Sequence, residues 1–281
     1  MPYRLPVAAT IAEAFRFLTG RFTDWFPAAL VPLTVWIALE FAIDRGWLAG
    51  LTFGLGSDAP MIAYMLLNAP SILAYLVIAV LLLLYAVALH RRALGMDRDA
   101  SVRAGLVWRA RHWRYVGQGV VVVAIVALGF IVSATFVPAL GAVAGTAGVL
   151  ESAAGQVTLT VIVLMLFAVP VALLACMVLP ALPAAAVEDH AVTLSEASSQ
   201  AKGNLWRTTF VLGLGGLLPF WLVERGITFL VARSAADTAF VAETTGIVVN
   251  FLGFTVLITL LSLVYRRLRD NVPLRRDQPP R

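Results

Sequence analysis

Charged side chains are scarce in this sequence: Asp, Glu, Lys and Arg make up 13% of its 281 residues. Soluble domains carry about 25% charged residues, whereas here hydrophobic residues reach 60% and the mean hydropathy is +0.89. This balance excludes a protein that faces water on all sides. The single cysteine, Cys176, excludes an intramolecular disulfide, and its position inside an apolar stretch favours a packing role over a redox role.

Residues for metal binding and catalysis are also few. The three histidines, His90, His112 and His190, are scattered and lack the i, i+4 spacing of a zinc-binding helix. No glycine-rich loop carries the Lys-Ser or Lys-Thr pair of an ATP-binding P-loop. The one acidic–histidine cluster is Glu188-Asp189-His190. We expect Glu188 to pair with an arginine from another of the sequence repeats described below. The sequence therefore predicts no enzymatic activity, no cofactor and no metal site.

Six long, nearly charge-free stretches determine the expected fold class. A bilayer core about 30 Å thick needs roughly 20 apolar residues in a helix, and lipid offers no partners to unpaired backbone groups. The stretches predict membrane-spanning helices near residues 25–43, 70–89, 115–137, 157–179, 205–223 and 245–265. We expect an all-α polytopic membrane protein with a single membrane domain over residues 1–281. No cleavable signal peptide is apparent, so the first span is expected to act as the insertion signal.

Basic residues lie almost entirely on one side of the predicted spans. That side holds 18 of the 21 Lys and Arg residues and 9 acidic residues, whereas the opposite side holds 3 basic and 7 acidic residues. This is the positive-inside pattern, which predicts a multi-pass protein with both termini in the cytoplasm. The basic excess, which includes the cytoplasmic tail at 266–281, is expected to attract anionic phospholipid headgroups. We expect no nucleic-acid partner.

A short unit recurs three times at intervals of about 90 residues. An ungapped alignment begins the copies at Glu13-Ala14, Arg103-Ala104 and Glu196-Ala197, and it places Gly20, Ala110 and Gly203 at one position and Thr23, Trp113 and Trp206 at another. A period of this length indicates one building block used repeatedly. The sequence thus predicts three two-helix pseudo-repeats, at about 10–95, 100–190 and 193–270.

Each repeat is predicted to begin with an amphipathic helix that lies in the plane of the cytoplasmic headgroups. Thr10 with Glu13, and Thr193 with Glu196, match capping boxes that start two of these helices. The second copy lacks such a box. Its apolar stripe is expected to include Leu106, with neighbouring arginines on the polar face.

Turns and anchoring residues are expected to follow each in-plane helix. Gly20 and Gly203 are the predicted points at which the chain turns toward the membrane. Trp favours the membrane–water interface, and the long Arg side chain can reach lipid phosphates. The candidate interfacial and lipid-contact residues are Trp25, Arg111, Trp113, Arg114, Trp206 and Arg207.

The exit of the fourth predicted span carries a more specific pattern. It reads Leu179-Pro-Ala-Leu-Pro-Ala-Ala-Ala-Val-Glu188, then Ser195-Glu196-Ala197, then Gly203-Asn-Leu-Trp206-Arg207. This pattern resembles the six-span bacterial families typified by the glycerophosphoryl diester phosphodiesterase membrane domain and the YciC-like inner-membrane proteins. The resemblance implies a location in the bacterial cytoplasmic (inner) membrane. It does not imply phosphodiesterase activity, because that chemistry belongs to a separate soluble domain. The stretches between the predicted spans are too short to form one.

Two spans contain residues that break or bend helices. The fourth contains Pro170, and the fifth contains three glycines followed by Pro219. Such positions line the substrate path in some transporters, although small residues also let helices pack closely. We expect a non-enzymatic inner-membrane protein that organises or engages lipids or an envelope protein partner. A small permease or export component, with a path near spans four and five, is the alternative.

Overall fold

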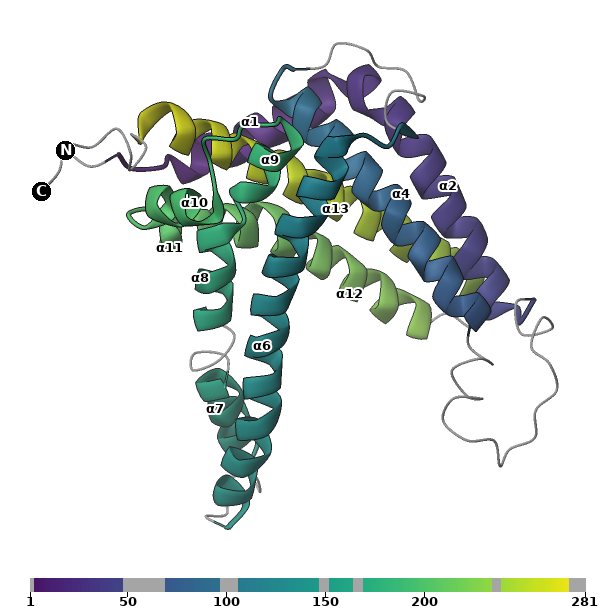
Figure 1. Ribbon diagram of the computed structural model, residues 1–281. Coiled ribbons are helices and arrows are strands. Elements are labelled where there is room, and N and C mark those ends of the chain that lie inside the picture. Colours follow the sequence, from purple (N-terminus) through teal and green to yellow (C-terminus); the bar gives the residue numbers. More distant parts are fainter. Residues whose placement is uncertain are drawn as a thin grey trace, which may run out of the picture.

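The computed structural model describes residues 3–47, 69–96, 106–146, 152–163, 169–233 and 239–272. Within these ranges every regular element is a helix (Figure 1). The helices are α1 (Val7–Gly20), α2 (Phe22–Asp44), α4 (Ala69–Ala93), α6 (Ala110–Thr146), α7 (Ala153–Val163), α8 (Val169–Val178), α9 (Ala181–Ala186), α10 (Leu194–Ala201), α11 (Leu205–Leu212), the π-helical turn η4 (Gly213–Leu217), α12 (Leu218–Ala232) and α13 (Ala239–Asn271).

Six helical stretches among the described residues are long and apolar enough to cross a membrane. They are Phe22–Asp44, Ala69–Ala93, Ala110–Gly129, Val169–Ala186, Leu205–Val231 and Phe240–Asn271. The all-helical architecture with six candidate spans is therefore confirmed. The division into three pseudo-repeats stays a prediction.

The third and fourth candidate spans differ most from the predicted ones. α6 runs for 37 residues, about 55 Å at 1.5 Å per residue, and extends beyond the predicted 115–137. The predicted span at 157–179 corresponds to α7 and α8, with 164–168 outside the described residues. The candidate span instead runs from α8 through a turn at Leu179 and Pro180 into α9. α6, α7 and α8 form an arm that points away from α2, α4 and α12 (Figure 1).

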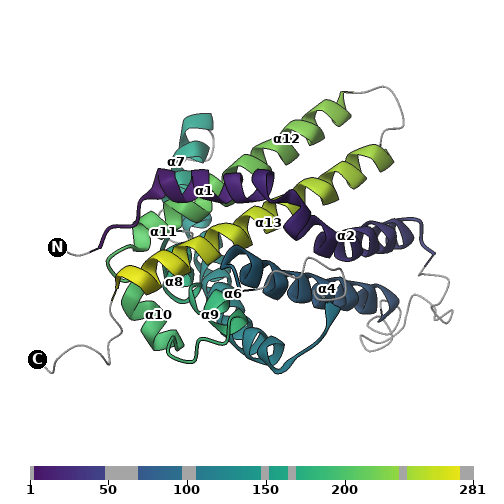
Figure 2. The ribbon, with the colours of Figure 1, turned by 90° about the horizontal axis from the view of Figure 1, so that it is seen from above.

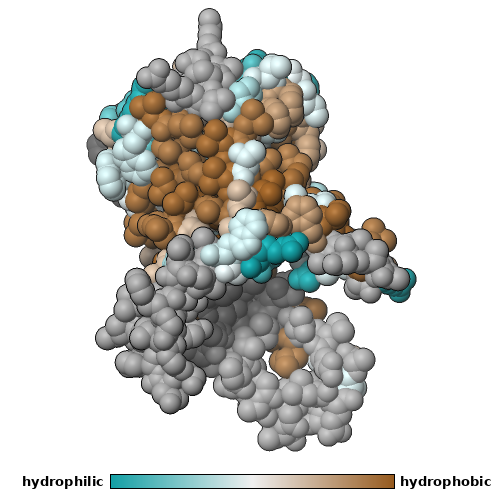
Figure 3. All heavy atoms as spheres, turned by 90° about the vertical axis from the view of Figure 1, so that its right-hand side faces the viewer, coloured by the Kyte–Doolittle hydropathy of each residue, from teal (hydrophilic) through white to brown (hydrophobic). Residues whose placement is uncertain are grey.

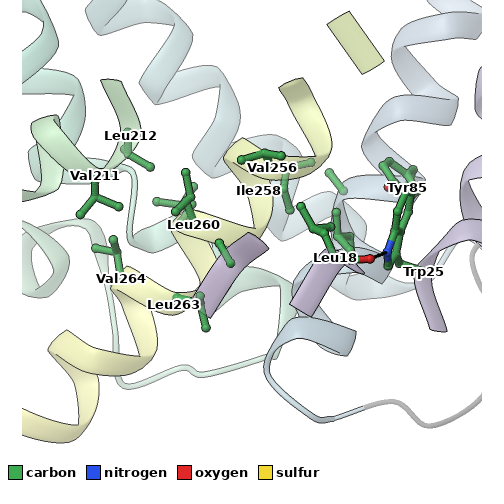
Figure 4. Packing of buried hydrophobic residues seen from close by; sticks show 14 of the residues in the cluster. Leu18, Trp25, Tyr85, Val211, Leu212, Val256, Ile258, Leu260, Leu263 and Val264 are labelled. Atoms are coloured by element: carbon green, nitrogen blue, oxygen red, sulfur yellow. Dashed lines mark hydrogen bonds between the residues drawn. The ribbon is translucent and has the colours of Figure 1, made fainter. Parts of the chain in front are cut away.

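α13 is the central helix of the bundle. It packs against α1, α2, α4, α9, α11, η4 and α12, and a larger share of it is buried than of any other candidate span. Figure 4 shows part of this core, where Leu260 and Val264 of α13 lie near Val211 and Leu212 of α11. Leu18 of α1 belongs to the same buried cluster. The N-terminal helix is thus packed into the bundle through α13.

α1 does not begin at the predicted capping box. The helix starts directly after Pro6, so Thr10 lies inside its first turns. The Thr10 hydroxyl donates to the Pro6 carbonyl at 2.7 Å, and the Glu13 carboxylate binds arginines of α13. The Thr10 prediction is wrong because the helix begins before Thr10, whose hydroxyl donates to a carbonyl and accepts no helix-end amide. For the second predicted capping box, the cap residue is confirmed, because Thr193 Oγ1 accepts from the Glu196 backbone N–H at 3.3 Å.

α1 runs beside α13, and the first turn of α1 and the last turn of α13 lie on the same side of the molecule (Figure 2). α1 buries one stripe of side chains, Thr10, Ala14 and Leu18, at the i, i+4, i+8 spacing of a single helix face. Of the in-plane helix predicted for the second repeat, the residues up to 105 lie outside the described ranges. Residues 107–109 are not helical, and Ala110 is already the first residue of α6, so the described part of this prediction is wrong.

The fifth candidate span contains the π-helical turn η4 between α11 and α12. Its glycines lie close to other helices: a Cβ on Gly215 would be 2.8 Å from Cγ1 of Ile11, and one on Gly216 would be 3.0 Å from Cδ1 of Leu257. Small residues therefore let α1 and α13 approach this turn. Pro219 stands near the start of α12 but inside the helical stretch that continues from α11 through η4, where a proline lacks the N–H of a helical hydrogen bond. The glycines of η4 are explained by packing.

The side of the molecule formed by α2 and α4 presents a broad hydrophobic surface (Figure 3). Large apolar side chains exposed on α4 include Ile72, Leu73 and Leu76, and α12 exposes Trp221 and Leu222. A soluble monomer rarely exposes apolar patches larger than a few hundred Å². Such a surface around helices of spanning length is suited to contact with lipid chains.

Candidate functional site: the polar layer

Polar contacts concentrate where α1, the segment after α9 and the last turns of α13 meet. We call this region the polar layer. It comprises Glu13, Arg111, Arg114, Glu188, Asp189, His190, Arg207, Tyr265, Arg266, Arg267 and Arg269. It contains three of the six predicted lipid-contact residues, Arg111, Arg114 and Arg207, and it is the best-defined polar arrangement among the described residues.

Glu13 joins α1 to the end of α13. Its two carboxylate oxygens form ion pairs with Arg266 and Arg267, one arginine to each oxygen. Partial burial alone raises the pKa of the Glu13 carboxyl, but the hydrogen bonds and charges of Arg267 and Arg266 outweigh burial and hold the pKa below its usual value. Glu13 therefore stays ionised and fixes both guanidinium groups.

Asp189 is the second acidic centre of the layer. Its Oδ2 accepts from the Tyr265 hydroxyl at 2.8 Å and from Arg269 Nε at 3.0 Å, and its Oδ1 accepts from the Ala191 backbone N–H at 2.9 Å. Burial raises the pKa of Asp189, and these three hydrogen bonds together with the Arg269 charge lower it further than burial raises it. The loop after α9 is thus attached to α13 through one ionised carboxylate.

Glu188 pairs with Arg111, whose Nη1 lies 3.6 Å from the Glu188 carboxylate. An arginine partner for Glu188 is as predicted, although Arg111 belongs to the same predicted repeat and not to another. Arg111 is buried, so its prediction as a lipid-contact residue is wrong: a buried charge needs a protein partner. Glu188 has a left-handed backbone with φ +61°, which costs an ordinary residue about 1–2 kcal/mol.

Arg114 and Arg207 bind protein backbone. Arg114 donates to the Asp189 carbonyl at 3.0 Å and to His190 Nδ1 at 2.9 Å. Arg207 donates to the Leu5 carbonyl at 3.3 Å. Both guanidinium groups therefore hold chain segments next to the helix starts, and each stays partly exposed.

The segment before α1 is held by Asn204, which the sequence analysis missed. Asn204 Oδ1 accepts from the Leu5 backbone N–H at 2.7 Å, and Asn204 Nδ2 donates to the Tyr3 carbonyl at 3.1 Å. Asn204 lies in the Gly203-Asn-Leu-Trp206-Arg207 pattern, so its place in that motif was the available signal.

The three predicted interfacial tryptophans divide into two kinds. Trp113 is 67% exposed and Trp206 is 55% exposed, in the first turns of α6 and α11. Trp25 is only 4% exposed, and its indole N–H donates to the Leu18 carbonyl at 2.9 Å (Figure 4). The prediction of Trp25 as an interfacial anchor is wrong, because it fills the core between α1, α2 and Tyr85.

A further exposed aromatic residue, Trp108, stands beside Trp113. The two indole rings meet edge to face with centroids 5.1 Å apart, and Trp108 also stacks on His112 at 5.3 Å. Near Trp206, Phe210 is exposed with its ring centroid 6.5 Å from the indole. Sequence reasoning missed Trp108 because it does not fall on the aligned repeat position.

The two glycines predicted as turning points of the chain lie at helix ends and have an unstrained backbone. Gly20 is the last residue of α1 and Gly203 follows α10, but neither has a left-handed backbone, and a Cβ on either would have no neighbour within 4 Å.

Pro170, in the first turn of α8, lines an apolar cavity of about 450 Å³ between α6 and α8. Ser198 of α10 lines the same cavity.

A buried hydrogen-bond chain links α4, α6 and α13 next to the polar layer. His90 Nδ1 lies 2.7 Å from Ser262 Oγ, and His90 Nε2 lies 3.2 Å from the Tyr115 hydroxyl. Ser262 donates to the Ile258 carbonyl at 2.8 Å, so its oxygen accepts from His90 Nδ1–H and the Tyr115 hydroxyl donates to Nε2. All polar atoms of the imidazole are satisfied, as a structural role requires.

The fold defines a multi-pass membrane protein, an all-helical chain with six helices long and apolar enough to cross a bilayer among the residues described. No family model, curated protein or solved structure matches this chain. Over the described ranges, no group of three His, Cys, Asp or Glu side chains is placed to hold a metal ion. What the polar layer offers chemically is fixed positive charge beside exposed aromatic rings.

Proposed function

We propose that this protein is a non-enzymatic inner-membrane protein that engages phospholipids through the polar layer and the tryptophans beside it. One observation carries the proposal: Trp113 and Trp206 are mostly exposed, while the adjacent Arg114 and Arg207 are fixed by backbone carbonyls. Each pair places an indole and a cation together at the start of an apolar helix, as residues at the headgroup level of a bilayer are arranged.

The charge distribution supports the same proposal. In the predicted topology most basic residues fall on the side that carries the polar layer, and cations near an anionic bilayer surface contribute about 1 kcal/mol each to attraction. In this proposal the layer and both chain termini face the cytoplasm, α1 and α10 lie in the headgroup plane, and the three repeats each supply one such segment. The resemblance to the six-span bacterial families is consistent with this placement.

The experiment is native mass spectrometry of the full chain purified in mild detergent. We expect the unaltered protein to retain phospholipid at fixed stoichiometry, and a Trp113→Ala/Trp206→Ala variant to lose it. Trp221→Ala is the matched control, because Trp221 is 51% exposed on α12, away from the polar layer. Equal lipid retention in all three proteins contradicts the proposal.

A small permease or export component is the second candidate, and the cavity beside Pro170 favours it. The glycines of η4 do not add support, since they pack against α1 and α13. Solute flux into proteoliposomes that changes in a Pro170→Ala variant, but not in the Trp113→Ala/Trp206→Ala variant, would favour the permease over lipid engagement.

A further inference from the structure

A second, smaller cavity of about 220 Å³ lies between α1, α4 and α13. Its lining consists of Glu13, Arg16, Phe17, Arg21, Ala93, Leu263 and Arg266. Pockets for drug-sized ligands measure roughly 300–1,000 Å³, so this one has room for a small group and not for a whole lipid. We call it the arginine pocket.

Helix periodicity explains why these side chains converge. Glu13, Arg16 and Phe17 stand at i, i+3 and i+4 on one face of α1, and Leu263 and Arg266 stand at i and i+3 on α13. Residues so spaced are neighbours on a helix surface. Two helix faces therefore form the walls, and the small side chain of Ala93, at the end of α4, leaves the space between them open.

The charge of the arginine pocket is positive and partly uncommitted. Three arginines line it against one carboxylate, and Glu13 is shared by Arg266 and by Arg267 outside the pocket. Arg16 and Arg21 are exposed, and their guanidinium groups make no hydrogen bond or ion pair with any residue that the structure describes. Their donors are available to an anion.

Neighbouring aromatic residues indicate the depth of the pocket in the membrane. Phe15 and Phe22, which precede Arg16 and follow Arg21 in the chain, are exposed. Phe22 stacks on Phe26 with ring centroids 4.4 Å apart. Phe side chains next to Arg residues are typical of amphipathic helices that lie at the boundary between headgroups and lipid chains.

We propose that the arginine pocket binds a phosphate group, with Arg16 and Arg21 as its hydrogen-bond donors and Arg266 as the third cation. Guanidinium groups bind phosphate oxygens through paired, charge-assisted hydrogen bonds. Phe17, Leu263 and Ala93 form the apolar part of the lining. The phosphate comes from a phospholipid headgroup or from free phosphate in solution. This inference deepens the proposed function and rests on it for the lipid as the source.

The test is isothermal titration calorimetry of the full chain in detergent, with dihexanoyl phosphatidic acid and inorganic phosphate as separate probes. Removal of a charge-assisted hydrogen bond costs about 1.5–3 kcal/mol, and 1.4 kcal/mol is tenfold in affinity. We therefore expect Arg16→Gln/Arg21→Gln to weaken binding of dihexanoyl phosphatidic acid at least about tenfold. Inorganic phosphate that binds as tightly as the lipid and competes with it identifies free phosphate as the source; binding at least tenfold weaker identifies the headgroup.

Arg4→Gln/Lys202→Gln is the matched control, because both side chains are exposed cations outside the pocket and the variant loses the same net charge. We expect its affinity to stay within about twofold of the unaltered protein. Glu13→Gln should act in the opposite direction and tighten binding, since it removes the one carboxylate and releases Arg266. Equal losses in the two double variants, or full affinity in Arg16→Gln/Arg21→Gln, overturn the pocket assignment.

The two proposals fail in different ways. Normal lipid retention in Trp113→Ala/Trp206→Ala, with phosphate binding lost in Arg16→Gln/Arg21→Gln, contradicts the proposed function and leaves the pocket as a phosphate site. Lipid lost in the tryptophan variant, with phosphate affinity unchanged in the arginine variant, supports the proposed function and overturns the pocket.

Discussion

Asp189 and Arg269, which lie 80 residues apart in the chain, meet with 3.0 Å between Oδ2 and Nε. The same oxygen accepts from Tyr265, one turn earlier on α13. The carboxylate thus binds two successive turns of the central helix from a loop that follows α9. Together with the ion pairs of Glu13, this contact attaches two separate chain segments to the end of α13.

Replacement of Asp189 by Asn is expected to destabilise the bundle. The variant keeps the size of the side chain but removes the carboxylate charge that accepts from Arg269 and Tyr265, and the net contribution of one such hydrogen bond is typically about 0.5–1.5 kcal/mol. Asp270→Asn is the control, because Asp270 is exposed. Thermal unfolding in detergent should show a lower Tm for Asp189→Asn alone. Equal Tm values for the two variants would show that the Asp189 contacts contribute nothing to stability.

Stability should fall in acid as the two centres become protonated. The pKa values of Glu13 and Asp189 are lowered in the folded protein. Each therefore contributes stability that is fully present above its unfolded pKa of about 4 and is lost as pH falls through the folded pKa. We expect Tm to drop below about pH 4, and the drop to be smaller in Glu13→Gln/Asp189→Asn. An identical pH profile in this variant contradicts the assignment.

Gly215 should not tolerate a methyl group. A Cβ there would lie 2.8 Å from Cγ1 of Ile11 and 3.1 Å from Cδ1 of Leu260, so the buried side chains around it must shift. Overpacking of this kind costs about 1–3 kcal/mol. Gly226→Ala is the control on α12, where the added Cβ has no neighbour within 4 Å and helix propensity improves by up to about 1 kcal/mol. Chemical denaturation in detergent should rank Gly226→Ala above Gly215→Ala.

Truncation to Ala should affect the stability of two tryptophan positions to very different extents. Trp25→Ala empties a core site and loses the hydrogen bond to Leu18, so we expect a loss of about 3–5 kcal/mol in unfolding free energy. Trp113→Ala removes an exposed ring and should change stability by no more than about 0.5 kcal/mol. Similar losses for both would contradict the division into core and interfacial tryptophans. Denaturation curves at one detergent concentration provide the comparison.

Features that depend on local sequence were predictable. Long apolar stretches predict helices wherever they occur, and the described chain has six helices of spanning length. The cap of α10 at Thr193 was also predictable, because the hydroxyl and the amide that it accepts from are three residues apart. An arginine partner for Glu188 was also predicted, although the repeat that supplies it was not.

Features that depend on distant residues were not predictable. Thr10 matches the same capping pattern as Thr193, yet arginines 253 and 254 residues away bind Glu13. Trp25 resembles the other interfacial tryptophans in sequence, but its neighbours Leu18 and Tyr85 place it in the core. A single sequence carries no signal for such long-range pairs, and here the tertiary contacts override the local pattern.

The most direct test of lipid engagement is the membrane depth of the two exposed tryptophans. Spin labels on Trp113→Cys and Trp206→Cys, each in a Cys176→Ala background, would be measured in anionic vesicles by power-saturation electron paramagnetic resonance. A label on Arg225→Cys, at the far end of the bundle, is the control. The account predicts that labels 113 and 206 lie at headgroup depth on one side of the bilayer, with label 225 on the other. Labels 113 and 206 at hydrocarbon depth, or on opposite sides, would contradict it.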